Sequence, residues 1–361
     1  MRILRVAQKV YPDVKGGGPY HVHAMSRDQA AMGHDVTVLT VRTDPELPPV
    51  ETRDGYTVVR YDPAVNLLGN DISLGLARFL AEAEAYDVMH AHSHLYFATN
   101  LAAIKRFLGD IPLAITNHGL YSQNAPEWVF DLYLRTVGRW TFNQADVVFC
   151  YTETDKERVR EFGVSSRIEV VPNGIDTERF TPEGPESELV NSDGQVVLFV
   201  GRLVEGKRPQ DAIRAVSRVA ETRDVELYVV GDGTMRSELE AMADDDIVTF
   251  LGQVPYDEMP AIYRTGVALL LPSRAEGLPR TVLEAFASGV PVVSSHLEHT
   301  APIVQEGGET VPIGDVEGYV QSLERMLEFG EIGKKGRKAV VEEFRWRDTV
   351  KQATISLQSI I

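Results

Sequence analysis

Two glutamates separated by seven residues, Glu276 and Glu284, are the residues of this 361-residue chain best placed to bind a ligand. They stand where an expected strand, residues 267–271, ends and an expected helix begins. In open α/β sheets, ligands bind beside the carboxyl ends of the strands, so this junction predicts a binding site. A carboxylate there can accept hydrogen bonds from neutral hydroxyls, and its two oxygens match a vicinal diol such as that of a ribose or a hexose.

The backbone between the two glutamates could bind an anion. The N–H groups of Gly277, Leu278 and Thr281 are candidate unpaired donors at the start of the expected helix, suited to a phosphate or a polarised sugar oxygen. The alternative is a helix that carries acidic residues near its N-terminus, which the helix macrodipole favours without any ligand.

Two cations follow a second expected strand, residues 196–200. A diphosphate bound there would meet Arg202 and Lys207, a planar fork and a point charge that together can offset two negative charges. The alternative is that both are surface charges at the entry to a helix.

The expected strand at 226–230 ends in a similar way, at Gly231-Asp232-Gly233. A dinucleotide-binding fingerprint would need glycine at position 236, where Arg236 stands, so binding of NAD is disfavoured. A tight turn without a ligand is the alternative for this loop.

Three glycines, Gly16, Gly17 and Gly18, follow the first expected strand of the chain. Because they lack a Cβ, they let the backbone approach a ligand closely. The alternative is a mobile loop that contacts nothing. His118 follows the expected strand 112–116, although an isolated histidine at a strand end is more often structural than catalytic.

A run of histidines, His90, His92 and His94, would place three imidazoles on one side of a strand. That spacing could bind zinc. No carboxylate or cysteine is adjacent to the run, so we predict no metal site.

Together these motifs resemble those of the family 4 glycosyltransferases, which have the GT-B fold. The matching segments are Gly-Gly at 16–18, His-Gly at 118–119, Asn-Gly-Ile-Asp at 173–176, Gly-Arg-Leu with lysine at 201–207, Gly-Asp-Gly at 231–233, Leu-Gly-Gln-Val at 251–254, Glu-x7-Glu at 276–284 and Phe-x-Trp at 344–346. The resemblance spans nearly the whole chain. It departs from the family pattern at Arg208, since glycine usually follows the lysine.

The resemblance implies roles for these residues. Glu276 would contact the donor sugar, and Glu284 would hold the nucleotide ribose. Arg202 and Lys207 would bind the donor diphosphate and stabilise the charge that grows on it as the glycosidic bond breaks. His118 would face the reacting sugar. The implied catalytic residues are His118, Arg202, Lys207 and Glu276, and the implied donor-binding residues are Gly16, Gly17, Gly18, Arg202, Lys207, Gly231, Gly233, Val254, Glu276, Gly277, Leu278, Pro279, Thr281 and Glu284.

The implied activity is retaining transfer of a sugar from a UDP or GDP sugar, without cofactor or metal, to a glycan, a lipid-linked molecule or a small molecule. One alternative is a nucleotide-sugar epimerase with the GT-B fold, against which the Glu276 to Glu284 spacing speaks. The other is a noncatalytic protein that binds nucleotide sugars or glycans, since a fold does not establish activity.

The implied architecture is GT-B: two Rossmann-like, doubly wound α/β domains facing across a cleft. The alternation of strand-like apolar runs with amphipathic helical stretches independently predicts parallel α/β structure. We expect an acceptor-binding domain over 1–182, a linker rich in Pro, Gly, Ser and acidic residues over 183–194, and a donor-binding domain over 195–346. A last helix, about 347–361, would return to the first domain.

The composition is strongly acidic, with a net charge of -17. This charge argues against nucleic acid as a partner, because neutralising phosphates needs a basic face. Nine of the 36 basic residues are lysines and 27 are arginines, a pattern typical of proteins from salt-accumulating cells. We therefore predict a halophilic protein, with an ordinary acidic protein as the alternative. At about 1 M salt the Debye length is only about 3 Å, so an anionic substrate must be held by direct contacts.

No apolar run is long enough to span a membrane, and residues 1–6 read as a strand, so we expect a soluble cytoplasmic protein. Cys150 follows an apolar run and is expected to be a buried, inert thiol. The aromatic segment 127–142 has two interpretations. It could pack in the core beneath the first sheet, or it could contact a lipid-linked acceptor at the inner face of the plasma membrane.

Overall fold

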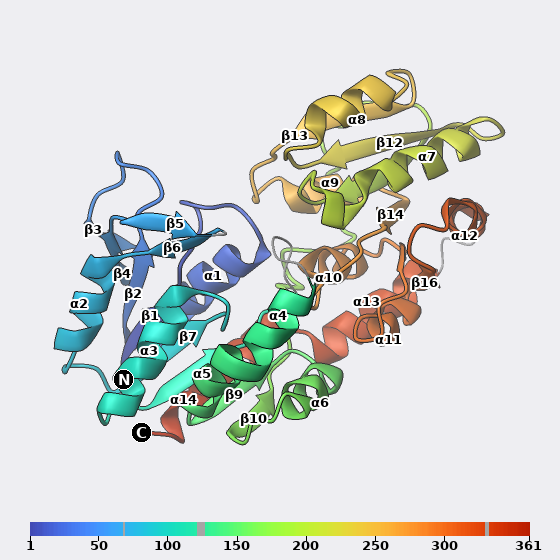
Figure 1. The fold of residues 1–361 in the computed structure, drawn as a ribbon. Helices are drawn as coiled ribbons and strands as arrows, with labels where there is room; N and C mark the ends of the chain where they lie inside the picture. The colour runs from blue at the N-terminus through green and yellow to red at the C-terminus, as the bar shows by residue number, and fades with distance from the viewer. Residues whose placement is uncertain (68, 121–126, 329–331) are drawn as a thin grey trace. The chain divides into compact units, whose positions relative to one another are not determined.

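Residues 1–67, 69–120, 127–328 and 332–361 are described by a computed structural model of the chain. The chain divides into two compact units (Figure 1): unit 1 comprises residues 1–172 and 348–361, and unit 2 comprises residues 173–347. The predicted boundary at residue 182 and the predicted linker 183–194 thus lie inside unit 2. One reason is Phe180, which is fully buried and packs its ring 5.9 Å from that of Tyr263.

Unit 1 contains an eight-stranded sheet in the order β10-β9-β8-β7-β1-β2-β4-β3. All neighbouring strands are parallel except β3, which pairs antiparallel with β4. The strands are β1 (Arg2–Val6), β2 (Asp35–Val41), β3 (Val50–Arg53), β4 (Tyr56–Tyr61), β7 (Val88–His92), β8 (Leu113–Thr116), β9 (Val147–Cys150) and β10 (Arg167–Val170), and β5 (Val65–Leu67) and β6 (Asn70–Ile72) form a separate hairpin.

The helices of unit 1 connect these strands and cover the sheet. They are α1 (Gly17–Ala31), α2 (Leu74–Glu82), α3 (Phe97–Leu108), α4 (Glu127–Tyr133), a π-helical turn (Leu134–Gly138), α5 (Arg139–Asn143) and α6 (Glu153–Glu161). Leu4 and Val6 of β1 belong to the core beneath α2 and α3, whereas Arg5 between them reaches Ser26 of α1 at 2.8 Å. Because successive strand residues face opposite sides, the sheet has helices on both faces, as predicted.

Unit 2 contains a six-stranded, fully parallel sheet in the order β13-β12-β11-β14-β15-β16. The strands are β11 (Gln195–Val200), β12 (Val225–Val230), β13 (Val248–Gly252), β14 (Ala268–Leu271), β15 (Val292–Ser295) and β16 (Gly308–Val311), and the helices are α7 (Pro209–Ala220), α8 (Arg236–Met242), α9 (Met259–Thr265), α10 (Arg280–Ala287), α11 (Ala301–Gln305), α12 (Val316–Glu328) and α13 (Ile332–Glu343). The chain order reverses between β11 and β14, which makes their carboxyl ends the place where such sheets bind ligands.

The final helix, α14 (Trp346–Gln358), returns to unit 1, where Figure 1 shows it in red beside β9 and β10. Gln352 donates to the carbonyl of Val170 at 2.8 Å, and Thr354 accepts from Gln29 of α1 at 2.9 Å. Across the described ranges, no helix combines the length and the apolar character that a membrane span requires.

Candidate functional site

The candidate site of unit 2 lies at the carboxyl ends of the neighbouring strands β11 and β14. β11 leads into a 3₁₀ turn that ends at Lys207, and β14 leads into the loop that carries Glu276. The N–H of Arg274 donates to the carbonyl of Gly206 at 2.8 Å, which joins the two loops. Lys207 Nζ and Glu276 Oε1 consequently form an ion pair whose side chains are only 15% and 6% exposed.

Glu276 is also held through its backbone, since His299 Nε2 lies 2.6 Å from its carbonyl oxygen. The next three residues, Gly277, Leu278 and Pro279, are buried, and Thr281 is partly exposed in the first turn of α10. Pro279 is the N-cap of that helix, and the predicted order of strand and then helix is present in this segment.

Glu284 lies on α10, and each of its carboxylate oxygens is already hydrogen-bonded. Tyr256 donates to Oε1 at 3.0 Å, and Tyr263 of α9 donates to Oε2 at 2.9 Å. Arg280 adds a positive charge, with Nε 3.6 Å from Oε1. The Glu284 side chain is 6% exposed, so its charge depends on these donors rather than on water.

Gly231 and Gly233 pack against the backbone that follows β11. A Cβ at Gly231 would lie 1.9 Å from the carbonyl oxygen of Gly201, and a Cβ at Gly233 would lie 2.3 Å from that of Leu203. Only glycine fits at such distances. The loop after β12 is therefore packed directly beside the segment that carries Arg202, which is exposed.

Arg208 stands where the family pattern has glycine, and its backbone has φ 51° and ψ 45°. This left-handed conformation costs a non-glycine residue roughly 1–2 kcal/mol. Its side chain compensates, since Nε donates to the buried carboxylate of Asp211 at 2.6 Å. The departure from the family pattern therefore leaves the backbone turn in place.

The candidate site of unit 1 centres on His118, which directly follows β8. Its Nε2 lies 3.0 Å from His92 Nδ1 and its Nδ1 lies 2.8 Å from the hydroxyl of Tyr151. The His21 ring makes an edge contact with the His118 ring at 5.4 Å. Burial lowers the pKa of His118 to about 4, so this imidazole is neutral at pH 7.

The neighbouring histidines are neutral for the same reason. His90 lies 2.7 Å from Thr116 Oγ1 and 3.3 Å from the guanidinium of the buried Arg5. Burial, followed by the charge of Arg5, lowers the pKa of His90 well below its usual value. Burial and then His90 do the same for His92, whose Nε2 has no hydrogen-bond partner among the described residues.

The expectation that three imidazoles share one side of a strand is wrong for His94. β7 ends at His92, and Ser93 has a positive φ of 65°, which turns the chain. The His94 ring instead packs 4.7 Å from that of Phe142. In the part of the chain that the structure describes, no group of three His, Cys, Asp or Glu residues is arranged to hold a metal ion.

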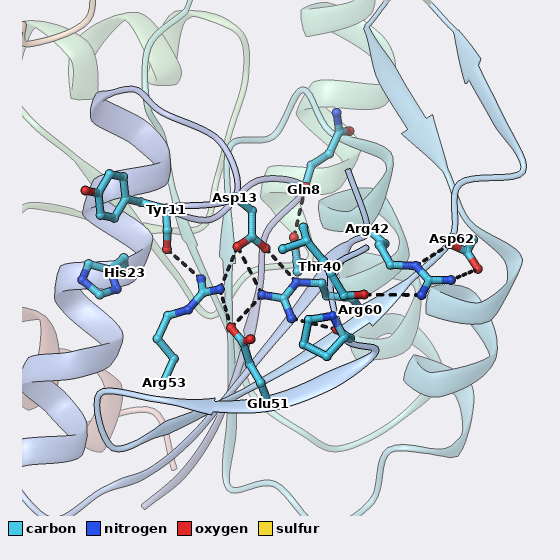
Figure 2. A network of polar contacts seen from close by, with 12 residues as sticks. Gln8, Tyr11, Asp13, His23, Thr40, Arg42, Glu51, Arg53, Arg60 and Asp62 are labelled. Carbon is cyan, nitrogen blue, oxygen red and sulfur yellow. Dashed lines mark hydrogen bonds and ion pairs between the residues drawn. The ribbon is translucent and has the colours of Figure 1, made fainter. Parts of the chain in front are cut away.

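A buried ionic cluster holds the segment that precedes the three glycines (Figure 2). Asp13, whose side chain is 2% exposed, receives hydrogen bonds from Arg60 Nε and Arg53 Nη2, both at 2.7 Å. Glu51 accepts from Arg60 at 2.9 Å. Burial alone would raise the pKa of Asp13, but these hydrogen bonds outweigh it and hold the pKa below its ordinary value.

The three glycines continue directly into the helix that follows this loop. Gly16 is the N-cap of α1, and Gly17 and Gly18 lie in its first turn. A Cβ at Gly18 would lie 3.8 Å from His118 Nδ1, which places the glycines beside the histidine cluster of unit 1.

Comparison with known proteins shows which family the chain belongs to. Residues 15–179 match the family described as Glycosyltransferase Family 4, and residues 194–328 match the one described as Glycosyl transferases group 1. A glycogen synthase of Mycobacterium tuberculosis is 30% identical over 394 residues, which cover 98% of this chain and 93% of that protein. The chain is a family 4 glycosyltransferase.

Solved structures agree with this family at the level of the fold. Sucrose-phosphate synthase from Thermosynechococcus elongatus superposes with a TM-score of 0.82 at 20% identity and covers 100% of this chain and 99% of its own. Anabaena Alr3699/HepE in complex with UDP and glucose gives 0.78 at 18% identity, with coverage of 99% and 100%. The predicted GT-B fold, with two Rossmann-like parallel sheets, is confirmed.

The activity of this family 4 glycosyltransferase is transfer of a sugar from a nucleotide sugar, as predicted. Family membership decides against the epimerase and the noncatalytic binding protein. The motifs located Lys207, Glu276, Glu284 and His118, and the structure brings the first two into contact within unit 2.

Several residues around these side chains were not predicted as site residues. They are Tyr256, Tyr263 and His299 in unit 2, and Asp13, His92 and Tyr151 in unit 1. A buried tyrosine reads as core in a sequence, because only the fold shows where its hydroxyl points. His92 was noted only as part of a zinc-like spacing.

Proposed function

We propose that this family 4 glycosyltransferase transfers the sugar with retention of the anomeric configuration, from a UDP or GDP sugar held mainly by unit 2. The observation that carries the proposal is the ion pair of Lys207 with Glu276, in the loop that leads into α10 and Glu284. A diphosphate supplies two negative charges and a sugar supplies hydroxyl donors, which are the partners that a cation and a carboxylate need. The UDP and glucose in the Anabaena structure support a uridine donor.

The ion pair would rearrange when the donor binds. Lys207 turns to the diphosphate together with Arg202, and the released Glu276 oxygen accepts from a hydroxyl of the sugar. Glu284 binds the ribose diol. Gly277, Leu278, Pro279 and Thr281 complete the contacts of the sugar and phosphates. Gly16–Gly18, Gly231, Gly233 and Val254 are further proposed contacts of the donor.

The chemical step we propose is displacement from the front face of the sugar. The bond from the anomeric carbon to the diphosphate oxygen breaks, and a bond from that carbon to the acceptor oxygen forms on the same face. The diphosphate takes the proton of the acceptor hydroxyl. Arg202 and Lys207 stabilise the charge that grows on the diphosphate, which is preorganised electrostatic catalysis. Neutral His118 would face the reacting sugar and would exchange its hydrogen bond with His92 or Tyr151 for one with a sugar hydroxyl.

The test compares the two glutamates in unit 2. Glu284→Ala should weaken binding of the free nucleoside diphosphate by about 1.5–3 kcal/mol, because the ribose loses a charged acceptor. Glu276→Ala should bind it at least as well as wild type, because Lys207 is then unpaired, but should turn over slowly. Isothermal titration and steady-state kinetics measure both, and equal nucleotide binding by wild type and Glu284→Ala would remove the ribose assignment.

We further propose that the reaction needs no metal, since Lys207 and Arg202 supply the positive charge. Transfer should persist in excess EDTA, and loss of activity that returns with added manganese would contradict this. The acidic composition supports a cytoplasmic protein adapted to salt, so activity should be retained as KCl rises towards molar concentrations.

The acceptor side is proposed to meet a lipid surface through the face formed by α3, α4 and α5. Exposed apolar residues on these helices include Phe107, Leu108, Trp128, Leu132 and Trp140, and the rings of Phe107 and Trp140 lie 6.2 Å apart. In the same segment Phe130, Leu134 and Phe142 are buried in the core. The buried residues agree with the interpretation of this segment as core. The exposed ones support the proposed contact with a lipid surface, because tryptophans suit the membrane interface.

Sedimentation with phosphatidylcholine and phosphatidylglycerol vesicles tests this contact. The double variant Trp128→Ser, Trp140→Ser should lose vesicle binding. Leu74→Ser, an exposed apolar residue at the start of α2, serves as the matched control. Equal sedimentation of the two variants would contradict the contact and leave a soluble acceptor.

A further inference from the structure

Two tyrosines donate hydrogen bonds to the carboxylate of Glu284, one to each oxygen. We propose that Tyr263 and Tyr256 are positioning residues that make Glu284 selective for a ligand with a free vicinal diol, a ribonucleotide rather than a deoxynucleotide. This inference rests on the proposed function, in which Glu284 binds the ribose. It assigns the selectivity to residues that do not themselves touch the ligand.

The direction of each hydrogen bond is fixed by its surroundings. Arg280 Nη2 lies 2.9 Å from the Tyr256 hydroxyl, and a guanidinium can only donate. The single proton of Tyr256 must therefore go to Glu284 Oε1, 3.0 Å away. Tyr263 is fully buried, and burial together with the charge of Glu284 raises its pKa well above the usual value. It stays protonated and donates to Oε2 at 2.9 Å.

The remaining acceptor capacity of Glu284 matches a diol. Each carboxylate oxygen has about two lone-pair sites. Tyr256 occupies one site on Oε1 and Tyr263 occupies one on Oε2, which leaves one site on each oxygen. Two adjacent hydroxyl groups of a ribose supply one donor for each of these sites. A deoxyribose supplies fewer donors and leaves a charged acceptor unsatisfied, which disfavours its binding.

The tyrosines also fix the rotation of the carboxylate. The Tyr263 ring packs 5.9 Å from the buried Phe180, and Arg179 lies over the Tyr256 ring at 4.6 Å. Both hydroxyls are therefore held by packed rings. Without the hydroxyl of Tyr263, Glu284 can turn towards Arg280, whose Nε is 3.6 Å from Oε1. The two free lone-pair sites would then no longer face the diol together.

The experiment measures the dissociation constants of UDP and 2′,3′-dideoxy-UDP by isothermal titration, or of the guanosine pair if the chain prefers GDP. Wild type should bind the ribonucleotide at least about tenfold more tightly, since one hydrogen bond to a charged group exceeds the 1.4 kcal/mol of a tenfold change. Tyr263→Phe should bring the ratio of the two dissociation constants, dideoxynucleotide to ribonucleotide, close to one. The dissociation constant of the dideoxynucleotide itself should change little. Tyr256→Phe, at a half-buried site, should lower the ratio in the same direction.

Tyr319→Phe is the matched control, because Tyr319 is also fully buried in unit 2 and its hydroxyl lies 2.7 Å from Ser295 Oγ. It should keep the wild-type ratio. If wild type discriminates and both Tyr263→Phe and Tyr256→Phe keep its ratio, the inference is wrong and the role of Glu284 stands. If wild type itself shows no discrimination, the ribose assignment of Glu284 fails as well.

Discussion

The candidate site of unit 2 is built from charges that offset one another, whereas that of unit 1 is built from rings that carry no charge. Lys207 and Glu276 pair directly in unit 2. In unit 1, His118 contacts His92 and Tyr151, and burial holds the imidazoles neutral. Arg5 brings a buried charge to His90, and the other buried charges described above for unit 1 lie in the Asp13 cluster.

The two sites differ in the kind of ligand that each could bind. A paired cation and carboxylate can exchange partners when an anion arrives, without leaving either charge buried alone. Neutral rings cannot attract an anion, but they can share hydrogen bonds with hydroxyl groups at little desolvation cost. This contrast agrees with the proposal that unit 2 binds the diphosphate and that unit 1 meets an uncharged hydroxyl.

The largest expected effect comes from breaking the charge pair of unit 2. Lys207→Ala should lower the turnover number by about 10² to 10³, because the leaving diphosphate loses a preorganised cation. Lys207→Arg should recover only part of this loss, since a planar guanidinium cannot replace a compact ammonium. Steady-state kinetics at low and high KCl measure both variants. Rescue of Lys207→Ala by salt would show that a mobile cation suffices and that the fixed pair is unimportant.

The next largest effect should come from the charges of unit 1. Asp13→Ala leaves Arg53 and Arg60 with Glu51 as the remaining shared carboxylate of the cluster. Breaking a buried pair costs about 3 kcal/mol of unfolding free energy. Urea denaturation measures the loss. Asp62→Ala removes an exposed partner of Arg42 and should change stability very little. Similar losses in the two variants would mean that burial does not distinguish these ion pairs.

The smallest effect is the pH dependence that neutral histidines impose. The folded pKa of His118 is about 4, below the unfolded value of about 6.5, so the unfolded chain binds more protons between these pH values. Stability should therefore be complete above pH 6.5 and fall as the pH drops towards 4. The free energy of unfolding should change with pH by at most about 1.4 kcal/mol per pH unit for each such histidine.

His118→Gln tests this contribution in urea denaturation at pH 7, 6 and 5. In the variant, the unfolding free energy should depend less steeply on pH, because the contribution of one histidine is gone. The contributions of His90 and His92, whose pKa values are also lowered, should remain. An unchanged slope would mean that His118 is already protonated in the folded protein near pH 6.

The fold and the identity of the charged side chains could be predicted from the sequence, but their partners could not. Glu276 and Lys207 were found from motifs, yet their pairing depends on β11 and β14 being neighbours, which joins positions 69 residues apart. Asp13 follows a proline and resembles an ordinary turn residue. Its role depends on Arg53 and Arg60, which β3 and β4 bring to it.

Local conformation limited the prediction in a different way. The alternation of His90, His92 and His94 suggested one face of a strand, but the positive φ of Ser93 ends that alternation. Such a backbone angle has no clear signal in a serine. At Arg208 the sequence did mark an unusual position, because a family glycine is replaced there.

The route of α14 has a consequence for how the protein folds during synthesis. Unit 1 needs residues 348–361, which supply Thr354 to Gln29 and the buried Val350 and Leu357 to its interior. Residues 173–347 can form their own sheet as soon as they leave the ribosome, while residues 1–172 still lack part of their covering. Unit 1 is thus begun first during synthesis and completed last. Until α14 is made, part of its apolar surface stays exposed, which is the condition under which chaperones bind nascent chains.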